Sequence, residues 1–129
     1  MIQNGDDPDF QVMITAQEAW PVFERAVLAA KSHIWGSFRI FDLATQLRSP
    51  EAREIGETWF DLLEHVLCRG VRIHITVSDF DPIFATELHR LTWRTVRQAA
   101  ALAEVSDCSI HNLRVTPHLH PAKAGRLPW

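Results

Sequence analysis

The sequence predicts an α/β fold with the element order β-α-β-α-β-α-β. We expect a mostly parallel sheet, although a mixed sheet is also compatible with the pattern, and we expect helices on both faces of the sheet. Two segments alternate like strands, residues 33–42 and 71–78, and a helical apolar pattern between residues 49 and 69 separates them. Strands that alternate with helices form parallel sheets with right-handed crossover connections. The pattern therefore indicates a single layer of sheet rather than a helical bundle or a β-sandwich.

The first predicted strand is the short apolar run FQVMI at residues 10–14. Thr15 and Glu18 then have the spacing of a capping box, and apolar residues follow at helical intervals. Pro21 removes a backbone donor from this helix. We therefore expect the helix to begin nearer Ala19 or to bend.

The second predicted strand, residues 33–42 (HIWGSFRIFD), has apolar residues on both of its faces. Such a strand is typical of the centre of a parallel sheet that is covered on both sides. Gly36 within it weakens the strand or marks a close approach of another backbone.

The strongest helical pattern lies between Ser49 and Arg69. Ser49-Pro50 is an N-cap followed by proline at the first helical position, and apolar residues recur every three to four positions as far as Val66. Gly70 is placed to end this helix. The sequence therefore predicts one continuous amphipathic helix.

The last elements follow the same logic. Residues 71–78 alternate as a strand, and Asp81 with the following proline predicts a helix that runs to about Glu104 with Phe84 on its buried side. A fourth strand is predicted at residues 109–115, and the prolines after it predict irregular structure.

Composition and charge narrow the classes of protein. The 129 residues suit one domain, which we place at 10–115, after a flexible lead-in at 1–9 and before an irregular basic tail at 116–129. A formal net charge of −3 does not favour a nucleic-acid partner. No apolar run is long enough for a transmembrane segment. With two cysteines and no signal peptide, we expect a cytoplasmic protein whose Cys68 is a reduced core residue.

Candidate site residues lie where the predicted strands end, because ligands of open parallel sheets bind beyond the carboxyl ends of the strands. An arginine on an apolar strand needs a carboxylate partner or an anionic ligand, and basic side chains after a strand suit a phosphodiester. The candidate cleft-lining residues are Arg39, Asp42, Asp79, His118, His120 and Lys123.

Metal binding is an alternative function for the histidine-rich tail, because His118-x-His120 brings two imidazoles close together. No aspartate or glutamate follows Asp107, so the tail lacks further ligands of that kind. We expect neither a metal site nor a cofactor.

Two stretches carry a resemblance to a known family: residues 19–42, AWPVFERAVLAAKSHIWGSFRIFD, and residues 68–82, CRGVRIHITVSDFDP. Together they resemble the N-terminal part of the phospholipase D superfamily, near the bacterial phosphatidylserine, phosphatidylglycerophosphate and cardiolipin synthase-like proteins. The resemblance implies a phospholipase D-like half-domain and a reaction in which a histidine attacks the phosphorus and forms a phosphohistidine.

The family's signature, His-x-Lys followed after four residues by Asp, has no match in this sequence. Two positions after His118 stands His120, and two positions after His120 stands Ala122, with Lys123 one residue late. No aspartate follows Asp107. No catalytic residue of the family can therefore be assigned to this chain.

The resemblance implies that the chain is the N-terminal scaffold fragment of a phospholipase D-like phosphodiesterase or phosphatidyltransferase, inert by itself. Its expected partners are a phospholipid or other phosphodiester substrate and a missing C-terminal half, with the parent protein peripheral to the membrane. A homo-oligomer is expected to cover apolar surface. Two alternatives stay open: a complete non-catalytic α/β interaction domain, and a fragment of a phospholipase D-like nuclease.

Overall fold

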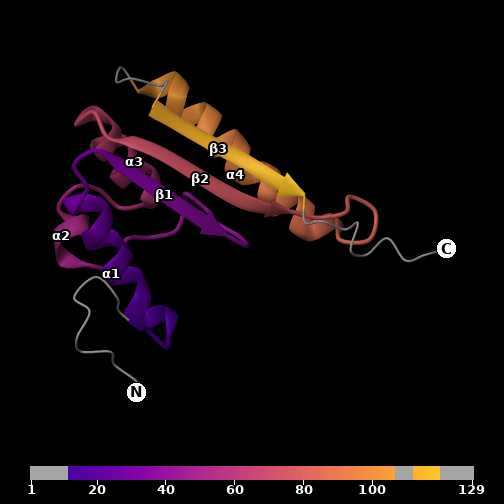
Figure 1. Cartoon of the computed structure of the whole chain (residues 1–129), viewed down its shortest axis with the longest axis horizontal. Coiled ribbons are helices and arrows are strands. Elements are labelled where there is room, and N and C mark those ends of the chain that lie inside the picture. The colour runs from indigo at the N-terminus through magenta and orange to yellow at the C-terminus, as the bar shows by residue number, and fades with distance from the viewer. Residues whose placement is uncertain (1–11, 107–111, 120–129) are drawn as a thin grey trace.

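The structure is a computed structural model that describes residues 12–106 and 112–119 of the chain (Figure 1). It contains four helices and three strands within these residues. In chain order they are α1 (Ala16–Ala29), β1 (His33–Phe38), α2 (Pro50–Arg53), α3 (Trp59–Cys68), β2 (Arg72–Asp79), α4 (Thr86–Val105) and β3 (Leu113–Leu119).

The three strands form one parallel sheet in the order β1-β2-β3, which confirms the α/β class and the parallel sheet. His33 pairs with Arg72 on β2, and Ile73 pairs with Leu113 on β3. The predicted first strand is not found. Residues 10 and 11 lie outside the described part of the chain, and residues 12–14 belong to no strand.

Helices pack on one face of this sheet, so the expectation that they cover both faces is wrong for the residues described. In Figure 1 the strands lie in front of α3 and α4, and no helix crosses them on the near side. The core joins the inward side chains of the sheet to α3, to the end of α4 and to the connection after β1. Its buried apolar members include Phe41, Leu43, Trp59, Leu62, Leu63, Val66, Ile73, Ile75, Val77 and Leu102.

Strand β1 is an edge strand rather than a central one. Its side chains alternate between exposed and half-buried, and Trp35 on the outer side is 75% exposed. The strand ends at Phe38, so Arg39 and Ile40 lie in a bend beyond it. The apolar outer face misled the prediction because Trp35 is apolar but is not covered.

Helix α1 begins as the capping box predicts. Thr15 Oγ1 accepts a hydrogen bond from the Glu18 amide at 3.2 Å, and Glu18 Oε2 accepts one from the Ile14 amide at 3.1 Å. The helix starts at Ala16 and contains Pro21, so the later start near Ala19 is wrong.

The predicted long helix is two helices, α2 and α3. Asp61 Oδ2 accepts hydrogen bonds from the amides of Glu57 at 2.8 Å and Thr58 at 3.1 Å, which starts α3 with a capping box of its own. Apolar periodicity did not reveal the break, because Ile55 continues the pattern but lies in the turn between the two helices. As expected, Gly70 follows α3 with a φ of 85°.

Helix α4 begins later than predicted. Asp81 Oδ1 accepts the amides of Ile83 at 2.8 Å and Phe84 at 2.9 Å, so it caps a separate turn, and the helix starts at Thr86. Phe84 is 91% exposed rather than buried. Strand β3 extends to Leu119 because proline is tolerated on an edge strand, contrary to the expected irregular structure.

Cys68 ends α3 at the surface and takes part in a disulfide bond, so the expected reduced core thiol is wrong. The other cysteine of the sequence, Cys108, lies outside the described residues. None of the helices in the described ranges has both the length and the apolar character needed to cross a bilayer.

Candidate functional site

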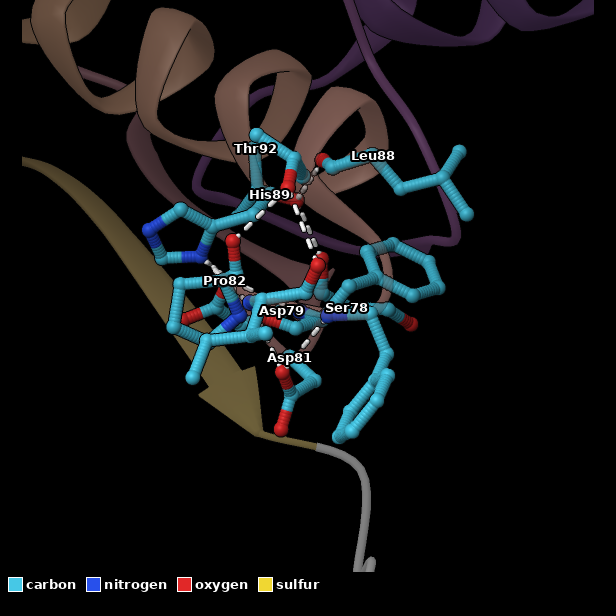
Figure 2. Close-up of polar contacts among 11 residues, drawn as sticks. Ser78, Asp79, Asp81, Pro82, Leu88, His89 and Thr92 are labelled. Atoms are coloured by element: carbon cyan, nitrogen blue, oxygen red, sulfur yellow. Dashed lines mark hydrogen bonds and ion pairs between the residues drawn. The ribbon is translucent and has the colours of Figure 1, made fainter.

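The turn between β2 and α4 builds a polar cluster at the carboxyl edge of the sheet (Figure 2). Asp81 holds the turn through the two amides described above, and its backbone carbonyl accepts from the Ala85 amide at 2.9 Å. The hydrogen bond from the Phe84 amide has the larger effect and that from the Ile83 amide the smaller one, and together they lower the pKa of the Asp81 carboxyl below its ordinary value. The turn sets the first helical residues of α4 directly beside the end of β2.

His89, in the first turn of α4, reaches back to Asp79, the last residue of β2. Its Nδ1 lies 2.8 Å from Asp79 Oδ1 and 3.1 Å from the carbonyl oxygen of Phe80. A carboxylate and a carbonyl can only accept hydrogen bonds, so Nδ1 carries the proton. In the neutral imidazole the other ring nitrogen, Nε2, has a free lone pair, and Figure 2 shows it directed away from Asp79.

This Asp79–His89 dyad is shielded but reachable. The side chain of His89 is 29% exposed and that of Asp79 is 14% exposed. The Phe80 amide also donates to Asp79 Oδ1 at 2.8 Å, which fixes the carboxylate. A carboxylate that sets the tautomer and the orientation of an imidazole is the arrangement that prepares histidine to accept a proton or to bind an anion.

Threonines on α4 attach the helix to the end of β2 and to the connection that follows β1. The Thr92 hydroxyl lies 2.5 Å from the carbonyl oxygen of Ser78, the residue before Asp79. Thr95 donates in the same way to the carbonyl of Phe41. Both threonines are buried. The dyad is therefore held between two rigid elements rather than on a loose loop.

Arg39 lies at the same edge, beyond the end of β1. Its guanidinium carbon is 5.6 Å from the centroid of the Phe80 ring, a cation–π contact. Arg39 is exposed rather than half-buried and has no carboxylate partner within the residues the structure describes, so of its two expected partners the anionic ligand stays a prediction. Its charge is therefore free of an ion-pair partner among the described residues at this edge of the sheet.

The Asp42 carboxylate is occupied by hydrogen bonds within the fold rather than placed to bind a ligand. Its Oδ1 accepts from Gln98 Nε2 at 2.7 Å and from the Ala44 amide at 2.9 Å, and Arg94 lies 3.7 Å from Oδ2. Burial raises the pKa of Asp42, but these hydrogen bonds and the charge of Arg94 outweigh it, and the pKa lies below its ordinary value. Gln98 is nine residues beyond His89, about 14 Å along the helix, so Asp42 is not part of the dyad.

The remaining candidates divide between two places. His118 pairs with Ser78 in the sheet and is exposed on the uncovered face, whereas the Asp79 side chain turns to the helix side. His120 and Lys123 lie outside the described residues. In residues 12–106 and 112–119 no three His, Cys, Asp or Glu side chains form a group that could hold a metal.

The partner of Asp79 was missed in the sequence because His89 was placed well inside a predicted helix. The sequence pattern that could have predicted this contact is Asp79 at a strand end, the Asp81-Pro82 turn after it, and His89 ten positions after Asp79. The turn capped by Asp81 delays the helix, which brings His89 into its first turn.

Comparison of the chain with protein-family models, with curated proteins and with solved structures finds no match.

Proposed function

We propose that this chain is the N-terminal scaffold part of a phospholipase D-like phosphodiesterase or phosphatidyltransferase and forms one wall of its phosphodiester cleft. The observation that supports the proposal best is the Asp79–His89 dyad at the carboxyl edge of a parallel sheet, where Arg39 lies against the ring of Phe80, the residue after Asp79. This edge is where open parallel sheets bind their ligands.

The chemistry of the wall follows from its groups. The Arg39 guanidinium suits a phosphate oxygen, because charge-assisted hydrogen bonds to phosphate are strong. His89 Nε2, held by Asp79, can accept a proton from the hydroxyl of a bound water or alcohol. In the family that this chain resembles, the histidine of a His-x-Lys signature attacks the phosphorus and forms the phosphohistidine. This sequence lacks that signature, so we propose that the chain alone is inert.

A binding experiment on the chain tests the wall directly. We expect diethyl phosphate, a small and stable diester, to shift the NMR signals of the His89 ring and the Arg39 guanidinium in a saturable way. Arg39→Gln should abolish saturation, while Arg97→Gln, an exposed change on α4, should not. Signals that stay unchanged at high millimolar diester would remove the support for a phosphodiester wall.

The reading frame beyond Trp129 tests the parent enzyme. We expect two His-x-Lys signatures downstream and hydrolysis of bis(4-nitrophenyl) phosphate by the longer protein. A stop codon directly after Trp129, or a downstream sequence without the signatures, would reject this proposal. Short-chain phosphatidylglycerol and a dinucleotide, offered as competing substrates, would separate a phospholipid enzyme, peripheral to the membrane, from a nuclease.

A non-catalytic interaction domain is a second candidate, and a specific observation favours it. The sheet face opposite the helices is uncovered in the described residues, and Trp35 on it is 75% exposed. All-parallel sheets are covered on both faces in nearly all known cases. An uncovered face therefore points to a binding partner whether or not the parent is an enzyme.

A further inference from the structure

The uncovered face of the sheet has a consistent chemistry. Its residues come from alternate positions of the three strands and are basic, aromatic or hydroxylic, without a carboxylate among them. They are His33, Trp35 and Ser37 on β1, Arg72, His74, Thr76 and Ser78 on β2, and Arg114, Thr116 and His118 on β3.

A depression of about 470 Å³ lies at the amino ends of the strands on this face. This volume is within the usual range of small-ligand sites, about 300–1,000 Å³. The polar and aromatic residues that line it are His33, Trp35, Arg72, His74, Asn112 and Arg114. Every one of them can donate a hydrogen bond, which suits a ligand rich in acceptors.

The two arginines of the depression have no neutralising carboxylate among the described residues. Neither Arg72 nor Arg114 forms an ion pair with any residue in the described ranges, and both are exposed. Arginine presents a planar fork of donors that matches the oxygens of a phosphate. The depression is therefore a cationic site in a chain whose net charge is −3.

Trp35 adds a flat apolar surface beside these charges. Its ring centroid lies 4.6 Å from that of His74, and His74 Nε2 lies 3.3 Å from Thr116 Oγ1, which holds the imidazole in place. The indole is supported on one side and 75% exposed. An exposed, supported indole is a stacking surface for a planar ring.

The charges and the exposed indole of the depression favour some kinds of binding partner over others. A second copy of the chain, docked face to face, would bring Arg72 and Arg114 against like charges. An apolar partner could bury only one large exposed apolar side chain among the described residues of this face, that of Trp35. A ligand with both a phosphate and a planar ring complements the cations and the indole together.

We propose that this depression binds a nucleotide, with the base stacked on Trp35 and the phosphate held by Arg72 and Arg114. The site is independent of the proposed phosphodiester wall, because it lies at the amino ends of the strands and the dyad lies at the carboxyl ends. The nucleotide can be a free nucleoside monophosphate or the unit of a single-stranded nucleic acid, since both present the same base and phosphate.

Titration of the full chain with AMP, followed by the NMR signal of the Trp35 indole N–H, tests the site. We expect saturable binding of AMP, and binding at least ten-fold weaker for adenosine and for inorganic phosphate, since each offers half of the contacts. Trp35→Ala lacks this indole, so its titration is followed by the ring signals of His74, and it should weaken AMP binding roughly ten-fold or more. Arg114→Gln should weaken it several-fold, while Arg97→Gln, on the helix side, should leave it unchanged.

Oligonucleotides of increasing length identify the source of the nucleotide. An affinity that rises with length indicates single-stranded nucleic acid, and an affinity equal to that of AMP indicates a free nucleotide. Equal binding of AMP and inorganic phosphate, no saturation by any nucleotide, or tighter binding of poly-glutamate or heparin would overturn the proposal. Trp35 and Arg114 are exposed, so circular dichroism should show that both variants fold.

Discussion

At the scale of the residue, Gly56 has little room for a side chain. A Cβ atom added there would lie 2.3 Å from Asp61 Cβ and 2.7 Å from Asp61 Oδ2. Asp61 cannot move away without losing its hydrogen bonds to the amides of Glu57 and Thr58. The glycine and the capping aspartate therefore fit together, and they separate α2 from α3.

We expect Gly56→Ala to lower the free energy of unfolding by about 2 kcal/mol, through overpacking and loss of the cap. Urea denaturation measures the change. Gly70→Ala is the matched control, because its φ is 85° but nothing lies within 4 Å, and it should cost about 1 kcal/mol through conformation alone. A Gly56→Ala protein as stable as the wild type would contradict the steric argument.

Asp42 makes the stability depend on pH. Its pKa lies below the ordinary value of 3.8, so the folded state favours the charged form. That contribution is present in full above pH 3.8 and is lost as the pH falls through the lower folded-state pKa. Stability should therefore decrease on acidification below about pH 4.

Asp42→Asn keeps an oxygen for the Gln98 and Ala44 hydrogen bonds but removes the charge that faces Arg94. We expect its unfolding free energy to fall less steeply than that of the wild type below about pH 4. Urea denaturation at neutral and acidic pH measures both slopes. Identical slopes for the two proteins would show that Asp42 does not contribute.

At the scale of the element, a buried carboxylate joins α1 to the start of α2. Glu24 is fully buried, and its Oε1 accepts the amides of Arg48 at 2.9 Å and Ser49 at 2.7 Å. Ser49 in turn caps α2 through the Ala52 amide at 3.2 Å. The charge is therefore solvated by backbone donors instead of by water.

We expect Glu24→Ala to lower the unfolding free energy by about 3 kcal/mol, because it leaves the buried amide of Ser49 and the partly buried amide of Arg48 without acceptors. Glu24→Gln keeps one oxygen and should cost about 1 kcal/mol. Thermal and urea unfolding give both values. Glu104→Ala, an exposed change on α4, is the control and should stay within about 0.5 kcal/mol of the wild type.

Local signals explain which elements the sequence predicts well. The cap at Thr15, the glycine at Gly70 and the alternation of β2 depend on neighbours in the chain, and the structure confirms each. The break at Gly56 depends on the capping box through which Asp61 starts α3, and the delayed start of α4 depends on Asp81, which caps a separate turn. Apolar periodicity runs through both places and does not report them.

The candidate site divides in the same way. Asp79 could be predicted, because a strand ends there and parallel strands end at one edge. Its partner His89 could not, because their contact depends on the turn capped by Asp81. Asp42 was predicted on the same grounds as Asp79, yet Gln98 and Arg94 on α4 occupy its carboxylate.

At the scale of the whole molecule, the two edges of the sheet differ in chemistry. The amino edge carries Trp35, Arg72 and Arg114 around a polar depression. The carboxyl edge carries the dyad and Arg39, but also apolar side chains at or beyond the end of each strand. Those that are exposed are Ile40 at 38%, Ile83 at 79%, Phe84 at 91% and Leu119 at 57%.

Exposed apolar side chains gathered at one edge favour association with another apolar surface. We therefore expect the isolated chain to self-associate through its carboxyl edge, in line with the homo-oligomer expected from the sequence. Sedimentation velocity over a range of protein concentrations should show a rising average mass. Because the contact would cover Arg39 and His89, diethyl phosphate should shift the equilibrium toward monomer.

The double variant Ile83→Ser, Phe84→Ser isolates the apolar contribution. Both side chains are almost fully exposed, so the substitutions should leave stability unchanged and move the protein toward monomer by several-fold. Val105→Ser is the matched control, since Val105 is 62% exposed at the other end of α4, away from this edge. If Val105→Ser reduces association as much as the double variant, the contact does not lie at the carboxyl edge, and the apolar side chains there have another role.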